Sequence, residues 1–211
     1  MRKKISKYIY IKKMKKVFIL GGTSPTGKIL LSHLQSSKDL DITCYVRSPE
    51  KLTSFKNLKI IKGDIIDQEN LSKSMKDNDI IITLLSGNTV KIQAENVINS
   101  MKKNNLKRII WMTGMGIHHE VPGPIKELLD KLVESQPQYV EAANLIMNSG
   151  LEYTLLRAAH LTDGNNRKYY TQKEGEPLRC NTCDRIAIAQ FIGEIIDNFE
   201  LYKNISIGLT N

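Results

Sequence analysis

The segment Val17-Phe-Ile-Leu-Gly-Gly-Thr-Ser-Pro-Thr-Gly-Lys28 decides how the chain folds. It begins with an apolar run typical of a buried strand and ends with residues suited to the first turn of a helix. Gly21 allows a tight turn out of the strand, and Gly27 allows the helix to pack close to the sheet. Backbone N–H groups at the start of such a helix bind phosphate groups. The segment therefore predicts a phosphate-binding loop between a strand and a helix.

On both sides of this loop, short apolar runs alternate with amphipathic segments. Such alternation is typical of βαβ units, whose strands lie parallel in one sheet. The expected strands are 16–20, 42–46, 58–61, 80–85, 108–112, 152–156 and 204–207. The expected helices are 26–35, 49–54, 68–75, 89–103, 124–147 with an interruption near Gln136-Pro137, and 185–197. The sequence predicts an α/β fold with a single doubly wound parallel sheet, a Rossmann domain spanning residues 15–211.

The net charge of +9 is concentrated at the N-terminus. Residues 1–16 carry eight basic residues and no acidic residue, which leaves the rest of the chain at +1. We expect residues 1–14 to form a basic, disordered extension, or Met14 to be the true start of the protein. A nearly neutral body lacks the basic excess of a nucleic-acid-binding domain, so we expect no specific nucleic-acid partner.

Composition also limits the class of protein. Three cysteines are too few and too scattered for a disulfide framework. No apolar run approaches the roughly 18 to 20 residues that cross a membrane, and no signal-peptide pattern follows the basic start. We therefore expect a cytoplasmic protein with no membrane partner, which could form a homo-oligomer.

The phosphate loop and the residue after the second strand together indicate a nicotinamide dinucleotide as cofactor. The residues expected to approach its pyrophosphate, besides the two glycines, are Thr23, Ser24, Pro25 and Thr26. Arg47 stands after the second strand, where NAD-preferring proteins usually place an acid that binds the ribose 2′-hydroxyl. A guanidinium favours a 2′-phosphate through its charge and its paired N–H donors. We therefore expect NADP(H) to be preferred, with NAD(H) possible.

The ends of the third and fourth strands supply the remaining expected cofactor contacts. The carboxylate of Asp64 could accept a hydrogen bond from the adenine amino group, and Ile65 could offer backbone atoms. A helix-capping or turn role for Asp64 is nearly as well supported. Leu85, Ser86 and Gly87 follow the fourth strand and should lie near the nicotinamide ribose, because ligands bind beyond the carboxyl ends of parallel strands.

The loop Gly-Gly-Thr-Ser-Pro-Thr-Gly resembles the Gly-Ala-Thr-Gly-x-Thr-Gly loop of atypical short-chain dehydrogenases/reductases, with Ser24 at the position of the middle glycine. Segments 111–116, 148–157 and 158–163 extend the likeness to the NAD(P)H-binding branch of NmrA-like proteins and flavin (biliverdin) reductase-like enzymes. In reductases of this branch, hydride passes directly to an aromatic acceptor stacked on the nicotinamide. The resemblance implies that Thr113 and His160 orient the acceptor, with Gly114 replacing the usual serine.

The usual Tyr-x-x-x-Lys pair of short-chain dehydrogenases is incomplete in this chain. In that pair the lysine lowers the pKa of the tyrosine so that the hydroxyl can exchange a proton with the substrate. Tyr139 is present, but Ala143 stands where the lysine belongs. Tyr139 is thus a candidate catalytic residue for which a structural role is the better interpretation.

These residues support two functions of different classes. The first is an NADP(H)-dependent oxidoreductase that passes hydride to a small flavin-, quinone- or carbonyl-type acceptor without the tyrosine–lysine pair. The second is a non-catalytic NAD(P)(H)-binding sensor or regulator of NmrA-like type. Arg157 and Arg179 could meet an acidic substrate or could equally be surface ion-pair partners.

Two further clusters carry weaker signals. His118, His119 and Glu120 are adjacent, but neighbouring residues of an extended segment point to opposite sides, so we expect no metal site. Cys180 and Cys183 have the C-x-x-C spacing but lack the strand–helix context of a redox motif, so we expect ordinary thiols.

Overall fold

The computed structural model describes residues 14–177 and 179–211. The basic extension expected at residues 1–14 lies outside the described residues except for Met14. The strands are β1 (Lys15–Leu20), β2 (Leu40–Val46), β3 (Leu58–Lys62), β4 (Ile80–Thr83), β5 (Arg108–Gly114), β6 (Glu152–Ala158), β7 (His160–Thr162), β8 (Tyr170–Gln172), β9 (Thr182–Asp184) and β10 (Ile205–Thr210). The helices are α1 (Pro25–Leu34), the 3₁₀ helix η1 (Pro49–Leu52), α2 (Gln68–Ser74), α3 (Val90–Lys103), α4 (Lys126–Glu134), α5 (Pro137–Met147) and α6 (Arg185–Asp197). Among the described residues, no helix is long and apolar enough to cross a membrane.

The expected α/β fold with a doubly wound sheet is confirmed. The main sheet has eight strands in the order β3-β2-β1-β4-β5-β6-β10-β8. The chain runs outward from β1 in one direction through β3, then returns to β4 and runs outward in the other direction. This reversal places a switch point between β1 and β4, where Rossmann folds bind their ligands. The sheet is not wholly parallel, because the edge strand β8 pairs antiparallel with β10.

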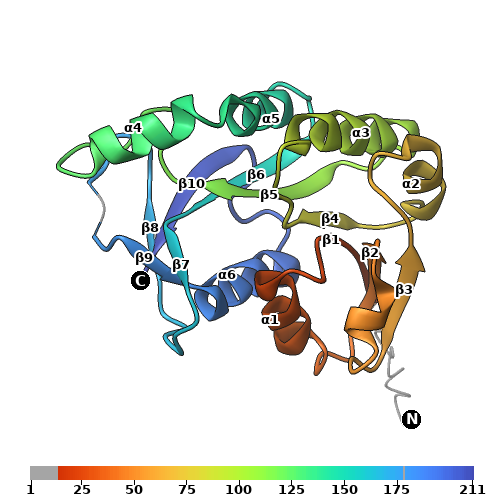
Figure 1. The fold of residues 1–211 in the computed structure, drawn as a ribbon. Coiled ribbons are helices and arrows are strands. Elements are labelled where there is room, and N and C mark those ends of the chain that lie inside the picture. The colour runs from red at the N-terminus through yellow and green to blue at the C-terminus, as the bar shows by residue number, and fades with distance from the viewer. Residues whose placement is uncertain (1–13, 178) are drawn as a thin grey trace, which may run out of the picture.

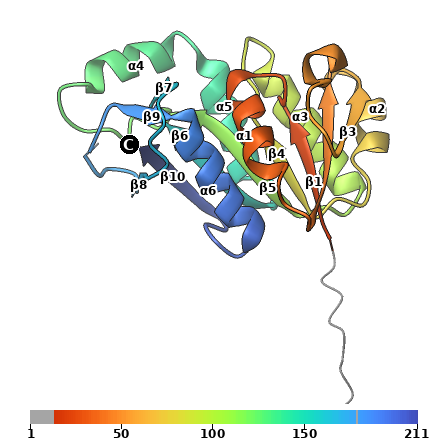
Figure 2. The ribbon, with the colours of Figure 1, turned by 90° about the horizontal axis from the view of Figure 1, so that it is seen from below.

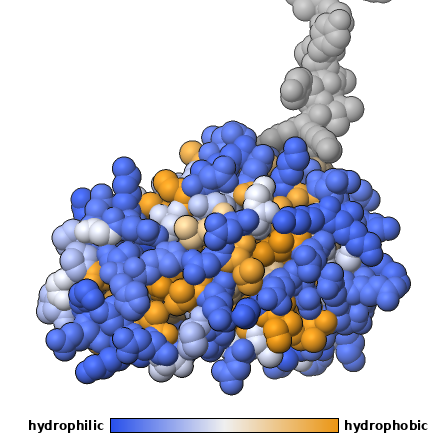
Figure 3. Space-filling view, turned by 90° about the horizontal axis from the view of Figure 1, so that it is seen from above, coloured by the Kyte–Doolittle hydropathy of each residue, from blue (hydrophilic) through white to orange (hydrophobic). Residues whose placement is uncertain are grey.

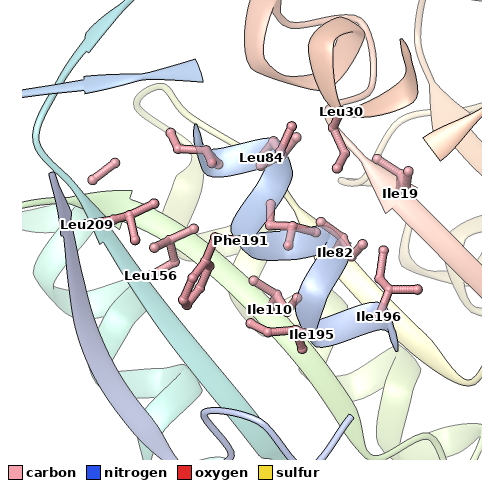
Figure 4. Close-up of a cluster of buried hydrophobic side chains, with 14 of the residues drawn as sticks. Ile19, Leu30, Ile82, Leu84, Ile110, Leu156, Phe191, Ile195, Ile196 and Leu209 are labelled. Carbon is pink, nitrogen blue, oxygen red and sulfur yellow. The ribbon is translucent and has the colours of Figure 1, made fainter. Parts of the chain in front are cut away.

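Helices cover both faces of the sheet (Figures 1 and 2). Helices α2, α3 and α5 lie on one face, and α1 and α6 lie on the other. Figure 4 shows Ile82, Ile110 and Leu156 of the sheet beside Phe191 and Ile195 of α6. All five of these side chains have an exposed fraction of 0%. Full burial of one such side chain stabilises the folded state by about 1.5–3 kcal/mol.

Strand β1 shows why the sequence reads as a continuous apolar run. Alternate residues of a strand point to opposite faces of the sheet. Val17 and Ile19 belong to the core on the α1 and α6 side, whereas Phe18 and Leu20 belong to the core on the α3 and α5 side. Because both faces are covered, every residue from Val17 to Leu20 is buried, as expected for a central parallel strand.

Several boundaries differ from those expected from the sequence. Strand β4 ends at Thr83 rather than at residue 85, because the chain after it turns along the β1–α1 loop. Strands β5 and β6 run two residues further than expected, since Gly114 and Ala158 still pair in register. The last strand, β10, runs to Thr210 rather than to residue 207 because it pairs with both β6 and β8. The break expected near Gln136-Pro137 is confirmed between α4 and α5.

Candidate functional site

A cleft of about 420 Å³ opens where β1, β2, β3 and β4 end, at the switch point of the sheet. Its walls come from the loops that follow these four strands and from the start of α3. The lining residues are Gly21, Thr23, Ser24, Tyr45, Val46, Arg47, Gly63, Asp64, Ile65, Ile66, Leu84, Leu85, Ser86, Thr89 and Gln93. The cleft thus gathers eight of the twelve residues expected at the cofactor, while Pro25, Thr26, Gly27 and Gly87 are outside its lining.

The β1–α1 turn requires glycine at two positions. Gly21 has a φ of +85°, and a Cβ atom there would lie 2.3 Å from the backbone oxygen of Leu84. A Cβ atom on Gly27 would lie 2.4 Å from the backbone oxygen of Gly21. Any larger residue would therefore force the loop away from the sheet at either point. These contacts explain the two glycines that define the loop in the sequence.

Ser24, which stands where the usual loop has its middle glycine, caps the N-terminus of α1. Ser24 is the N-cap of the helix, and its Oγ accepts a hydrogen bond of 3.0 Å from the backbone N–H of Gly27. Pro25 has no N–H to offer an anion. In this first turn, the N–H of Thr26 is left without a helical acceptor, as is general there.

Arg47 lies just after β2, is exposed, and lines the cleft. Within residues 14–177 and 179–211, its guanidinium forms no hydrogen bond or ion pair. Five N–H donors of a permanently charged group are therefore available at this wall of the cleft. The arrangement suits a phosphate group, which Arg can bind through two parallel hydrogen bonds.

The end of β3 is held by Tyr45. The Tyr45 hydroxyl donates a 3.1 Å hydrogen bond to the backbone oxygen of Asp64, and a Cβ atom on Gly63 would lie 2.1 Å from that hydroxyl. Burial, aided by the charges of Asp67 and Asp64, raises the pKa of Tyr45 to about 12, so the hydroxyl remains a donor. The Asp64 Oδ1 accepts a 3.1 Å hydrogen bond from the N–H of Ile66. Asp64 therefore shapes its own turn as well as lining the cleft.

Tyr139 connects the cleft to a second cavity. Its hydroxyl accepts a 2.9 Å hydrogen bond from the backbone N–H of Gly87, next to the cleft residue Ser86. The second cavity, of about 170 Å³, is lined by Gly114, Met115, Ile117, Leu132, Val133, Gln136, Tyr139 and Val140. Figure 3, which views the side of the molecule that carries α3, α4 and α5, shows apolar residues among polar ones on this face. We call this cavity the apolar pocket.

The three candidate catalytic residues are only partly gathered. Tyr139 lines the apolar pocket together with Gly114, the neighbour of Thr113. Thr113 is 6% exposed, and its Oγ1 has no hydrogen-bond partner among the described residues. His160 is exposed on β7 and belongs to the lining of neither cavity. Ala143, at the position of the usual lysine, is 0% exposed in the core beneath α5.

Arg157 is buried in the protein, so it is neither a substrate contact nor a member of a surface ion pair, the two roles expected from the sequence. Its side chain is 1% exposed and pairs through Nη1 with Glu120, whose side chain is 4% exposed. Glu120 also accepts hydrogen bonds from the N–H groups of Gly116 (2.9 Å) and His118 (3.0 Å). The ion pair therefore holds the loop after β5, which contributes Met115 and Ile117 to the apolar pocket. This pairing could not be read from the sequence.

The other weak motifs have structural partners. The Nδ1 of His118 lies 3.1 Å from Oε1 of Glu174, and the Nδ1 of His119 lies 2.7 Å from Oδ1 of Asp130. Arg179 lies over the ring of Tyr170, with 4.8 Å between its Cζ and the ring centroid. No group of three or more potential metal ligands occurs within the described ranges.

The C-x-x-C motif does lie at a strand–helix junction, contrary to the sequence interpretation. Cys183 is in β9, and α6 begins two residues later at Arg185. Cys183 is 0% exposed, and burial raises its pKa to about 12. Both cysteines of the motif are free thiols. A buried thiol of high pKa is a poor nucleophile, which fits a packing role for Cys183.

Sequence reasoning did not identify several residues of the cleft. Tyr45, Thr89 and Gln93 line it, and Thr89 and Gln93 lie at the start of α3, one turn apart. The available signal was the position of this helix start, directly after the loop that follows the fourth strand. In a doubly wound sheet, such helix starts border the ligand crevice.

Comparison with known proteins agrees with this geometry. The model of the NAD(P)H-binding family matches residues 21–199. A Rossmann-fold NAD(P)-binding family protein from Shigella flexneri is 32% identical, with 94% of each chain covered and a TM-score of 0.80. A wide-type short-chain dehydrogenase/reductase from Veillonella parvula, solved in complex with NADP, is 21% identical, with 93% of this chain and 94% of that chain covered and a TM-score of 0.80.

A curated relative matches over a shorter region. The isoflavone reductase homolog A622 of Nicotiana glauca is 30% identical over 105 residues, which cover 45% of this chain and 34% of that protein. The match thus spans about a third of the length of the curated relative. The family match and the Shigella flexneri relative both extend over most of the described structure, including the cleft. The chain belongs to the NAD(P)H-binding family.

Proposed function

We propose that the protein is an NADP(H)-dependent oxidoreductase that passes hydride between the nicotinamide and a small flavin-, quinone- or carbonyl-type acceptor. The observation that carries this proposal is the hydrogen bond from the N–H of Gly87, the residue after Ser86 of the cleft, to the hydroxyl of Tyr139, which lines the apolar pocket. One cavity suits a dinucleotide and the other suits an apolar ring. A bound nicotinamide would supply or accept the hydride where the two meet.

Residues of the cleft support a preference for NADP(H) over NAD(H). The guanidinium of Arg47 is available to bind a 2′-phosphate, and the residue directly after β2 is this arginine instead of the acid that NAD-preferring proteins place there. Thr23 and Ser24 line the cleft at the start of α1, and the N–H of Thr26 can bond a pyrophosphate oxygen. Because Ser24 occupies the N–H of Gly27, this loop offers fewer donors than an all-glycine loop would.

The apolar pocket favours a small, uncharged acceptor. None of its lining residues is charged, and five of them are Met115, Ile117, Leu132, Val133 and Val140. Its volume of about 170 Å³ is below the roughly 300–1,000 Å³ typical of pockets for drug-sized ligands. We therefore expect acceptors with one or two rings, such as simple quinones and aromatic aldehydes, to outperform a phosphorylated flavin.

Hydroxyl groups would orient the acceptor without a tyrosine–lysine pair, and the place of Tyr139 in the apolar pocket leads us to propose a catalytic role for it in place of the structural one favoured by the sequence. Tyr139 accepts a hydrogen bond from Gly87, so its own proton is available to an acceptor oxygen. The buried, unpartnered hydroxyl of Thr113 is a second candidate donor. For His160, an orienting role remains our prediction and requires an acceptor that reaches beyond the pocket toward β7. Buried Ala143 cannot replace the lysine.

The test is steady-state NADPH oxidation with a panel of small quinones, aromatic aldehydes and flavin mononucleotide. We expect turnover to be highest with the small neutral acceptors. Tyr139→Phe should lower kcat about 10²-fold or more, the loss typical when a positioned proton donor is removed, and leave the KM for NADPH unchanged. Tyr153→Phe is the matched control, because Tyr153 packs against the same core without lining either cavity.

Two outcomes would contradict the proposal. Turnover that is unaffected by Tyr139→Phe would remove the assigned role of the hydroxyl. Tight NADPH binding with no turnover of any acceptor would overturn the enzymatic proposal. In that case the buried Ala143 would support the alternative of a non-catalytic NAD(P)(H)-binding sensor or regulator of NmrA-like type.

A further inference from the structure

We propose that Gln136 binds a second oxygen of the acceptor, so that the apolar pocket selects rings that carry two oxygens over rings that carry one. This inference rests on the proposed function, in which the hydroxyl of Tyr139 meets the oxygen at the reacting end. The preferred acceptors are then quinones and aromatic aldehydes that also carry a hydroxyl group. No such role follows from the sequence, in which Gln136-Pro137 only marks an interruption between two helices.

The apolar pocket has room for about one ring. Its volume is about 170 Å³. An engineered cavity of about 150 Å³ in another protein binds benzene. Two of the residues that line the pocket, Gln136 and Tyr139, have polar side chains. A substituted ring that fills the pocket therefore contacts both of them.

The backbone of Gln136 is held where α4 meets α5. Its N–H donates a 3.0 Å hydrogen bond to the backbone oxygen of Val133, and its own backbone oxygen accepts a 3.1 Å hydrogen bond from the N–H of Tyr139. Pro137 disfavours the helical conformation in the residue before it, and Gln136 has a φ of −137° and a ψ of 56°. Gln136 is therefore fixed at the wall of the pocket, beside the helix that carries Tyr139.

The side-chain amide of Gln136, in contrast, has no partner. Gln136 is the N-cap of α5, but its side chain forms no capping hydrogen bond. Within residues 14–177 and 179–211, the amide forms no other hydrogen bond. The residue is half-buried, and both amide atoms remain open to solvent. An amide that is free to turn can present its NH₂ donors or its oxygen to a ligand.

The rest of the pocket decides which rings gain from this amide. No hydrogen-bond donor comes from the apolar side chains of the lining, which are Met115, Ile117, Leu132, Val133 and Val140. An oxygen that leaves water for such walls is costly to bury unless a donor meets it. The NH₂ group of Gln136 can bond an oxo or hydroxyl oxygen but gains nothing from a methyl group of similar size. The pocket therefore favours a ring with one oxygen at Tyr139 and a second at Gln136.

The experiment compares two ligands of similar shape, 1,4-dihydroxybenzene and 4-methylphenol, which differ in one hydroxyl or methyl group. Ligand-observed NMR measures their dissociation constants for the full chain saturated with NADP⁺. Methionine has an unbranched chain without an amide, so Gln136→Met should shift the ratio of the two constants toward 4-methylphenol. The expected shift is about two- to tenfold, equivalent to one hydrogen bond of about 0.5–1.5 kcal/mol. Gln136→Ala should shift the ratio in the same direction, and thermal unfolding checks that each variant is folded.

Gln138→Met is the matched control, because Gln138 is also a half-buried glutamine in the first turn of α5 but lines neither cavity. It should leave the ratio unchanged. An unchanged ratio in both Gln136 variants, or an equal shift in Gln138→Met, would overturn the assignment while leaving the acceptor pocket in place. Failure of the wild type to bind NADP⁺, or of its complex to bind either ligand, would instead overturn the proposed function.

Discussion

Replacing Arg157 with methionine removes one partner of an ion pair that lies inside the protein. The Arg157 side chain is 1% exposed, and its partner Glu120 is 4% exposed. Arg157 also donates from Nε to the Oγ of Ser206 at 2.9 Å. Methionine has an unbranched apolar chain that fits the space of the arginine stem without its charge. The substitution would leave the Glu120 carboxylate buried without its positive partner.

The expected loss of stability is large. Removing one partner of a buried pair typically costs about 3–5 kcal/mol, because the remaining charge is uncompensated. The total stability of a domain is about 5–15 kcal/mol, so the variant should be folded but much closer to its unfolding midpoint. Glu120→Gln leaves a single acceptor oxygen for Gly116 and His118 and should also destabilise. The double variant should lose less than the sum of the two single losses.

Urea unfolding followed by the fluorescence of Trp111, the single tryptophan, measures these free energies. Trp111 is 1% exposed in β5, so its emission reports loss of the core. Arg185→Met is the control, since its partner Asp163 has a side chain that is 77% exposed and such pairs contribute about 0–1 kcal/mol. A loss below about 1 kcal/mol in Arg157→Met, or additivity of the two variants within about 0.5 kcal/mol, would show that the ion pair does not stabilise the core as expected.

Three further predictions follow from single residues. Burial holds the pKa of His33 below its usual value of about 6.5, so the stability that the neutral ring contributes is present above that pH and is lost as the pH falls below it. In His33→Gln the urea midpoint should therefore depend less on pH between about pH 7 and pH 5, and an unchanged dependence would contradict this. Cys183, whose pKa burial raises to about 12, should resist iodoacetamide in the native protein at about pH 8 and react after unfolding, as mass spectrometry can show. Gly21→Ala would place a Cβ 2.3 Å from the backbone oxygen of Leu84 at a residue whose φ is +85°. Gly150→Ala is the control, because its φ is +78° but no heavy atom lies within 4 Å of the added Cβ. Left-handed strain alone costs about 1–2 kcal/mol, so Gly21→Ala should lower the thermal midpoint more than Gly150→Ala. Equal effects of the two substitutions would show that the close approach is unimportant.

The elements that could be predicted from sequence are those whose burial leaves a periodic pattern. β1 is a continuous apolar run because helices cover both of its faces, and the glycines at 21 and 27 mark the turn that follows. Strands β7, β8 and β9 were not expected, since each has three residues and includes exposed ones. A three-residue segment is too short to show a period of two.

Contacts between distant residues were not accessible from the sequence. Arg157 and Glu120 are 37 positions apart, and neither residue type is expected in a core unless it is paired. Asn96 likewise donates a 3.0 Å hydrogen bond to the backbone oxygen of Ile65, 31 positions away, and so holds the turn after β3 against α3. Arg47, by contrast, could be singled out in advance, because its place after the second strand of a βαβ unit defines which part of a dinucleotide it would meet.

The most direct test of the NADP(H) assignment is a side-by-side titration of the protein with NADPH and NADH, repeated for Arg47→Ala. We expect tighter binding of NADPH and a loss of about tenfold or more in Arg47→Ala for NADPH alone, since a hydrogen bond to a charged group contributes about 1.5–3 kcal/mol. Lys59→Ala removes the same charge from an exposed site on β3 outside the cleft and should change neither constant. Equal affinity for the two nucleotides in wild type and Arg47→Ala, or no binding of either, would contradict the assignment of this cleft to NADP(H).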